Sequence, residues 1–159
     1  MKKWFEENMI ASILLAILRI YLGFSWLSSG WSKATGEGFT AEGFLKGALG
    51  QTTGDHPSVL PFWGGFLENV AIPNVGIFNF LVVYGEIAVG IALIIGLFTR
   101  TALIFSLIMN FAFMFSGSTG VNPYYVLYAL ILLIGGRNTG KYGVDGLIVA
   151  KRFGNKARM

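Results

Sequence analysis

The chain has 159 residues, a net charge of +4 and no cysteine, and 54% of its residues are hydrophobic while 13% are charged. With a mean hydropathy of +0.64 it is too apolar for an ordinary soluble domain, so we expect one integral membrane domain over residues 1–159. The lack of cysteine excludes disulfides and cysteine-ligated iron–sulfur clusters. Because the basic residues flank apolar segments, the positive charge does not indicate a nucleic-acid partner.

Residues 9–31 form the first predicted membrane span. The segment follows the basic start "MKK", but it is too long for the apolar part of a signal peptide and it contains an arginine, Arg19. We therefore expect it to remain in the mature protein. An isolated charge near the bilayer centre costs about 2.5–3.5 kcal/mol on insertion scales, so Arg19 is expected to face the bundle interior and to have a partner there.

Residues 32–74 are expected to form a long loop outside the membrane. Two pieces of it, "TAEGFLKGAL" and "PFWGGFLENV", have apolar residues at helical spacing. Short amphipathic helices of this kind lie at a membrane interface, so we expect a lid over the bundle. The alternative is that they serve only in packing and anchoring.

Three further spans are expected at residues 75–97, 98–117 and 120–136. The last begins with Asn122 and Pro123, which suit a helix start, and ends at a pair of glycines. The sequence therefore predicts an all-α fold, a bundle of four transmembrane helices with the long loop after the first.

Basic residues are distributed unequally between the two predicted sides of the membrane. Only Lys33 and Lys46 lie on the side of the long loop. By the positive-inside rule both termini are cytoplasmic and residues 137–159 form a tail at the anionic inner surface of the cell membrane. The basic residues on the inner side are Lys2, Lys3, Arg100, Arg137, Lys141, Lys151, Arg152, Lys156 and Arg158.

Polar residues in three of the spans are expected to meet near the bilayer midplane. Arg19 and Glu86 each lie 10 residues from one end of their span, about 15 Å deep at the helical rise. In antiparallel neighbours they would lie level and pair, with Asn110 close to them. Such intramembrane groups are functional by default; the alternative is a structural salt bridge that fixes helix pairing. The aromatic rim of this pocket is expected to comprise Trp26, Trp31, Tyr84, Tyr124 and Tyr128.

The sequence offers few ligands for a bound redox centre. His56 is the single histidine and falls in the predicted loop, so no pair of imidazoles is available for a haem within the membrane. The glycine-rich stretches lack the strand context of a nucleotide-binding loop, and no metal site is predicted. A polar pocket beneath an aromatic rim suits a lipophilic ring with carbonyls, namely a quinone such as ubiquinone or menaquinone. Arg19 would donate a hydrogen bond to it, Glu86 would relay protons, and Asn110 and the rim would bind the ring.

Four stretches carry a resemblance to a known family: "LRIYLGFSWLSSGWSK", "GEIAVGIALIIGLFTR", "MNFAFMFSGSTGVNP" and "GRNTGKYGVDGL". In this order and spacing they resemble the DoxX/DoxD-like four-helix membrane proteins. The resemblance implies a membrane oxidoreductase subunit, and for the DoxD branch the large subunit of thiosulfate:quinone oxidoreductase. The positions that match the family's pattern are Arg19, Glu86, Asn110, Asn122, Pro123 and Asp145.

The resemblance leaves the partners and two other classes of function open. A complete enzyme would need a second redox subunit or a soluble redox enzyme, with membrane lipids around the bundle. One alternative is a non-catalytic membrane scaffold that anchors a redox partner. The other is a small solute or proton conductor, which with so few helices per chain would require a homo-oligomer.

Overall fold

The computed structural model describes residues 2–36 and 38–154, and every regular element in these ranges is helical. The predicted all-α fold is confirmed, while Lys156 and Arg158 of the predicted basic tail lie outside the described residues. The elements are α1 (Lys2–Glu7), α2 (Met9–Thr35), α3 (Glu42–Gly50), α4 (Pro61–Phe66), a π-helical turn η1 (Leu67–Ala71), α5 (Val75–Ile95), α6 (Thr99–Phe115), α7 (Asn122–Ile134), a 3₁₀ turn η2 (Gly136–Gly140) and α8 (Val144–Gly154).

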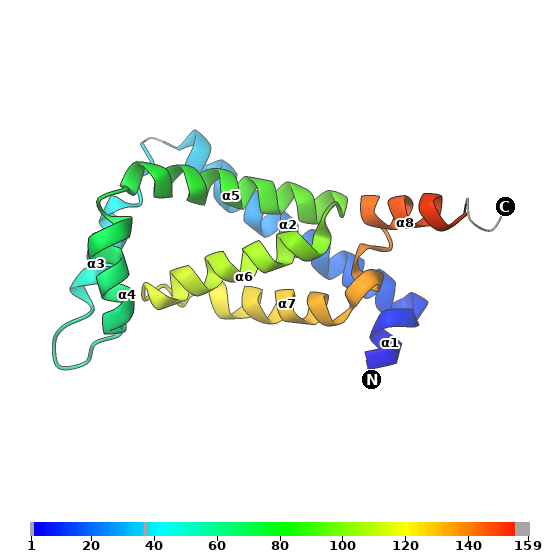
Figure 1. Ribbon diagram of the computed structural model, residues 1–159, viewed down its shortest axis with the longest axis horizontal. Helices are drawn as coiled ribbons and strands as arrows, with labels where there is room; N and C mark the ends of the chain where they lie inside the picture. Colours follow the sequence, from blue (N-terminus) through cyan, green and yellow to red (C-terminus); the bar gives the residue numbers. More distant parts are fainter. Residues whose placement is uncertain (1, 37, 155–159) are drawn as a thin grey trace.

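Helices α2, α5, α6 and α7 pack lengthwise into one bundle (Figure 1). Helices α2 and α5, with 27 and 21 residues, are long and apolar enough to cross a membrane. Helices α6 and α7 have 17 and 13 residues, or about 26 and 20 Å at the helical rise. They are apolar but shorter than the ~30 Å hydrocarbon core, so only two of the predicted spans have full spanning length as regular helix.

Glycines set the close packing of α2 against α5. A Cβ atom at Gly23 would lie 2.9 Å from the carbonyl oxygen of Gly90, and one at Gly30 would lie 2.9 Å from the backbone nitrogen of Ile87. Helices in membranes associate through such close backbone approach. These contacts fix the antiparallel register, with Gly23 beside Ile94 and Gly30 beside Ile87. One face of α2, which carries several of its small residues together with Arg19 and Trp26, is buried throughout: Ser12, Ala16, Arg19, Gly23, Trp26 and Gly30.

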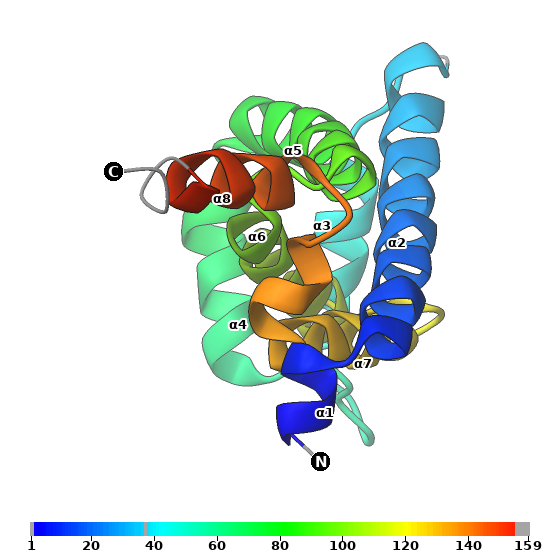
Figure 2. The same ribbon diagram turned by 90° about the vertical axis from the view of Figure 1, so that its right-hand side faces the viewer.

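The segment between α2 and α5 folds over one end of the bundle. Figure 1 shows α3 and α4 lying across the end where α5 begins, and Figure 2 shows α1 and α8 at the opposite end. We call residues 41–71, which contain α3, α4 and η1, the lid. Its own apolar core comprises Ala41, Leu45, Ala48, Val59, Leu67 and Ala71.

Two hydrogen bonds tie the lid to the bundle. The indole nitrogen of Trp63 donates to Ser116 Oγ at 2.8 Å, and the backbone nitrogen of Ala41 donates to Asn79 Oδ1 at 2.7 Å. The short helices predicted in residues 32–74 therefore exist, and they pack as a unit against the bundle.

Candidate functional site

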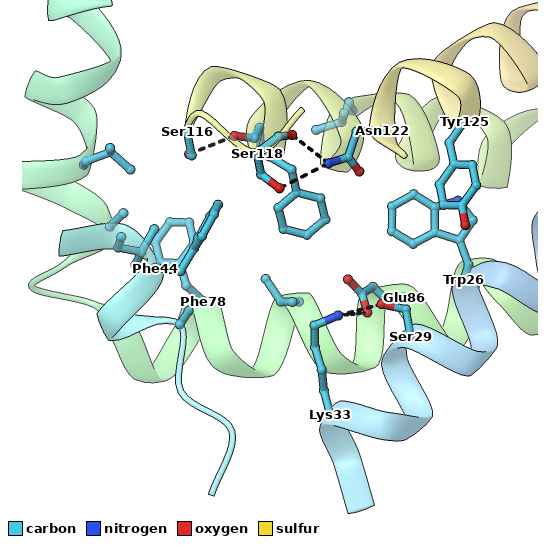
Figure 3. Close-up of a pocket in the computed structure, with 18 of the residues that line it drawn as sticks. Trp26, Ser29, Lys33, Phe44, Phe78, Glu86, Ser116, Ser118, Asn122 and Tyr125 are labelled. Atoms are coloured by element: carbon cyan, nitrogen blue, oxygen red, sulfur yellow. Dashed lines mark hydrogen bonds and ion pairs between the residues drawn. The ribbon is translucent and has the colours of Figure 1, made fainter. Parts of the chain in front are cut away.

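A cavity of about 600 Å³ lies between the lid and the half of the bundle beneath it. Its surface is mostly apolar, and its polar groups gather on two facing walls (Figure 3). Every helix of the bundle and every lid element contributes to it. The lining residues used below are Ser29, Lys33, Phe44, Trp63, Phe78, Glu86, Phe113, Ser116, Ser118, Asn122, Tyr125 and Trp26.

One polar wall is an ion pair between α2 and α5. Lys33 Nζ donates to Glu86 Oε2 at 2.7 Å and to Ser29 Oγ at 2.6 Å. The side chain of Glu86 is 2% exposed and that of Lys33 is 25% exposed. The other carboxylate oxygen of Glu86 points toward the cavity (Figure 3). A Cβ atom at Gly30 would lie 2.9 Å from the Cβ of Glu86, so the glycine lets α2 pack close to α5 there and places this carboxylate beside Lys33.

The facing polar wall is the turn between α6 and α7. Asn122 Nδ2 donates to the carbonyl oxygen of Ser118 at 2.8 Å and lies 3.5 Å from its hydroxyl. Ser116 Oγ donates to the carbonyl oxygen of Ala112 at 2.9 Å and accepts the Trp63 hydrogen bond. Gly117 has φ +82°, a conformation that favours glycine. The turn thus holds three polar side chains against an otherwise apolar space.

Aromatic rings form the remaining sides of the cavity. The ring of Trp26 is stacked on Phe113, with centroids 6.5 Å apart, and lies 6.2 Å from Tyr125. Phe44 of the lid meets Phe113 edge to face at 6.2 Å. Trp26 is fixed in place because its indole nitrogen donates to Ser106 Oγ at 2.9 Å. These walls can hold a flat apolar ring between them.

Arg19 lies elsewhere, and the predicted contact with Glu86 is wrong. Its guanidinium, fully buried, donates to the carbonyl oxygens of Leu93 at 2.5 Å and Tyr142 at 2.8 Å. The cation thus binds the C-terminal end of α5, where helix carbonyls lack partners and the helix dipole favours positive charge. Arg19 is not among the residues that line the cavity.

The reason is the register between α2 and α5. The prediction placed the ends of the two spans level. In the structure the last turn of α5 lies beside Gly23, so the first part of α2 extends beyond α5 and packs against α1, η2 and α7. Glu86 is level with Gly30, eleven residues along α2 from Arg19, or about 16 Å at the helical rise.

The segment around Tyr142, whose carbonyl oxygen accepts a hydrogen bond from Arg19, also caps the start of α6 through Asp145. The carboxylate of Asp145 accepts hydrogen bonds from the backbone nitrogens of Phe98 and Thr99 at 2.9 and 2.8 Å. Gly96 and Phe98 both have positive φ angles, 69° and 50°, so the chain reverses tightly between α5 and α6. Arg19 and Asp145 together join α2, α5, α6 and the start of α8.

The other predicted site residues are only partly brought together. Trp26 lines the cavity. Asn110 is fully buried, where it donates to the carbonyl oxygen of Ser106 at 2.9 Å, and it is not a lining residue. Tyr128 packs against Tyr21 with ring centroids 6.1 Å apart. The structure places three rim residues on outward faces of the bundle, with exposures of 61%, 55% and 61%: Trp31, Tyr84 and Tyr124.

Sequence reasoning missed Lys33 and the aromatic residues of the lid. Lys33 was assigned to the loop because the first span was ended at Trp31, whereas α2 continues to Thr35. The signal was present, since Ser29, Lys33 and the buried Gly30 continue the helical spacing. The lid residues Phe44 and Trp63 were identified as apolar faces of short helices, but nothing local indicates that these faces enclose a cavity.

Charged groups near the cavity are few. On the lid, Lys46 donates to Glu42 at 2.6 Å, and this hydrogen bond together with the lysine's charge lowers the pKa of that carboxyl. The pair is exposed and contributes little to stability. Among residues 2–36 and 38–154, no group of three or more His, Cys, Asp or Glu side chains could hold a metal ion.

Comparison with known proteins gives one result, at the level of the family. The family described as "TQO small subunit DoxD" matches residues 14–158, nearly the whole chain. The chain belongs to the DoxD family. By this description DoxD is the small subunit of TQO, which corrects the large subunit that the resemblance implies. No curated protein and no solved structure matches the chain. The DoxD match and the two long apolar helices together support a membrane protein that works as a subunit.

Proposed function

We propose that this DoxD-family chain is the membrane subunit of a quinone-linked oxidoreductase and that the cavity beneath the lid binds the quinone ring. The observation that carries the proposal is the ion pair of Lys33 with the buried Glu86 on the wall of a largely apolar, aromatic cavity. Glu86 and Trp26 keep their predicted roles in this proposal. Lys33 takes the role first given to Arg19, and Arg19 has a structural one.

The lining of the cavity fits a quinone. A volume of about 600 Å³ lies within the ~300–1,000 Å³ of ordinary ligand pockets. A lysine ammonium has three donors, of which Lys33 uses two, on Ser29 and Glu86. The third remains for a carbonyl oxygen of the ring. The rings of Trp26, Phe44 and Phe113 supply flat apolar surfaces on which such a ring stacks.

The chemistry follows from the same residues. A bound quinone accepts two electrons and two protons when it is reduced. Lys33 would orient the ring by donating to one of its oxygens, and Glu86 would accept and release a proton at the carboxylate oxygen that faces the cavity. The aromatic walls and the lid exclude water, so that protons move through Glu86 rather than through solvent.

We infer that all four helices of the bundle span the cell membrane, with flanking residues completing α6 and α7 over 98–117 and 120–136. Exposed basic side chains at the end opposite the lid support cytoplasmic termini and an outer lid. Helix α8 bears exposed Leu147, Ile148 and Val149 beside Lys151, as expected of a helix at an anionic membrane surface. The other exposed basic residues at that end are Arg100, Arg137, Lys141 and Arg152.

A second subunit or a soluble redox enzyme would deliver the electrons. The family's description as a subunit supports such a partner. Capture of a redox enzyme by a purified protein that binds no quinone would establish the scaffold alternative in its place.

Saturable binding of a short-chain ubiquinone analogue to the protein in lipid nanodiscs tests the proposal. Lys33→Met should weaken binding by roughly 10–150-fold, the value of one charged hydrogen bond of about 1.5–3 kcal/mol. Tyr84→Phe is the matched control, because Tyr84 is 55% exposed and does not line the cavity. Absence of saturable binding, or equal effects of Lys33→Met and Tyr84→Phe, would contradict the proposal.

A further inference from the structure

We propose that Ser118 and Asn122 form a second binding site for ring oxygen, so that the cavity selects a 1,4-quinone, which has an oxygen at each end, and also holds its reduced hydroquinone form. The inference rests on the proposed function and specifies its ligand. It starts from the arrangement in Figure 3, where the turn between α6 and α7 faces Lys33 and Glu86 across the cavity.

The hydrogen-bonding capacity of Ser118 and Asn122 is only partly used. Asn122 Nδ2 donates to the carbonyl oxygen of Ser118 at 2.8 Å, which leaves the acceptor Oδ1 of the amide for a ligand. The distance from Nδ2 to the Ser118 hydroxyl is 3.5 Å, too long for a strong hydrogen bond. The hydroxyl is the acceptor in that contact, so its own proton is available to a ligand as well. This wall offers one donor and one acceptor.

The facing wall also offers one donor and one acceptor, and there both belong to charged groups. Lys33 retains one donor, and the carboxylate oxygen of Glu86 that faces the cavity is an acceptor. A quinone carbonyl needs a donor, whereas a hydroquinone hydroxyl both donates and accepts. Two such walls, with aromatic rings between them, can satisfy both ring oxygens in either redox state. A ring with a single oxygen would use the charged wall alone, because charged hydrogen bonds are the stronger ones.

The turn can be altered without destroying it. Its closure uses the backbone carbonyl of Ser118, not the hydroxyl, so Ser118→Ala removes only the proposed ligand donor. Thr119 lies in the same turn with an exposed side chain and does not line the cavity. Thr119→Ala is therefore the matched control.

The experiment compares two ring compounds in nanodiscs: menadione, a 1,4-naphthoquinone, and 2-methyl-1-tetralone, which has one carbonyl. Ser118→Ala should weaken menadione binding by about 2–12-fold, the value of one neutral hydrogen bond, and leave tetralone binding unchanged. Thr119→Ala should change neither. Asn122→Leu also removes the Nδ2 donor that closes the turn, so it should weaken the binding of both redox forms. It should weaken that of reduced menadione, kept without oxygen, more than that of menadione, because the acceptor Oδ1 is lost as well.

The outcomes separate this inference from the proposed function. Menadione binding that depends on Lys33 but not on Ser118 would overturn the second oxygen site and leave the quinone cavity intact. Equal weakening of menadione and tetralone by Ser118→Ala would also overturn it, since the change would then act through the shape of the turn. Failure of the unaltered protein to bind menadione would overturn both.

Discussion

Replacing Lys33 tests how much its ion pair with Glu86 contributes to the stability of the bundle. In Lys33→Met the carboxylate of Glu86, 2% exposed, loses its cationic partner within an apolar cavity. Breaking a buried ion pair in this way costs about 3–5 kcal/mol. Because Lys33 keeps 25% of its side chain exposed, we expect the lower end, a loss of about 3 kcal/mol in the free energy of unfolding.

The double variant Lys33→Met/Glu86→Gln should be more stable than the sum of the single effects predicts. Removing the charge of Glu86 relieves the unpaired carboxylate, so the interaction energy should be at least about 1 kcal/mol. The assay is reversible unfolding in mixed detergent micelles, followed by far-UV circular dichroism. The same cycle with Arg19→Met and Glu86→Gln should be additive within about 0.5 kcal/mol, because the two groups bind different partners. Coupling of Arg19 with Glu86, and none of Lys33 with Glu86, would refute this reasoning.

Three further results are expected. Arg19→Gln should lower the free energy of unfolding by about 3 kcal/mol or more, because the carbonyl oxygens of Leu93 and Tyr142 lose a buried charged donor. A neutral effect in the micelle assay would contradict the binding of Arg19 at the C-terminal end of α5. Gly90→Ala should lower the free energy of unfolding by about 1–3 kcal/mol through overpacking, because its Cβ would lie 2.5 Å from the backbone nitrogen of Leu27. Gly76→Ala has open space and should be harmless, so equal effects of the two changes would contradict the register between α2 and α5. Single cysteines at Thr53 and Ala150, both exposed, should react with an impermeant reagent in intact cells only at Thr53; labelling at Ala150 would invert the topology.

The helical segments and the faces that they bury were predictable from the sequence, because both depend on the spacing of apolar and small residues along the chain. The small-residue face of α2 and the burial of Arg19, Glu86 and Asn110 follow from periodicity and from the cost of charge in lipid. The lid helices were recognisable for the same reason.

The register between α2 and α5 was not predictable in this way, because it depends on which glycines meet. An end-to-end alignment placed Arg19 beside Glu86, whereas the contacts of Gly23 and Gly30 shift the helices by several turns. That shift exchanges the partner of Glu86 for Lys33, and it leaves Arg19 to bind the end of α5. The cavity itself arises from lid aromatics far away in sequence, whose positions no local pattern determines.

Photoaffinity labelling maps the proposed quinone site most directly. An azido-ubiquinone is irradiated with the protein in native-lipid nanodiscs, and the labelled peptides are identified by mass spectrometry. The account predicts labels on cavity residues such as Trp26, Phe44 and Phe113, and their loss when unlabelled ubiquinone competes. Labels confined to lipid-facing residues such as Ile17 and Phe24, which are 60% and 66% exposed, and unaffected by the competitor would contradict the account.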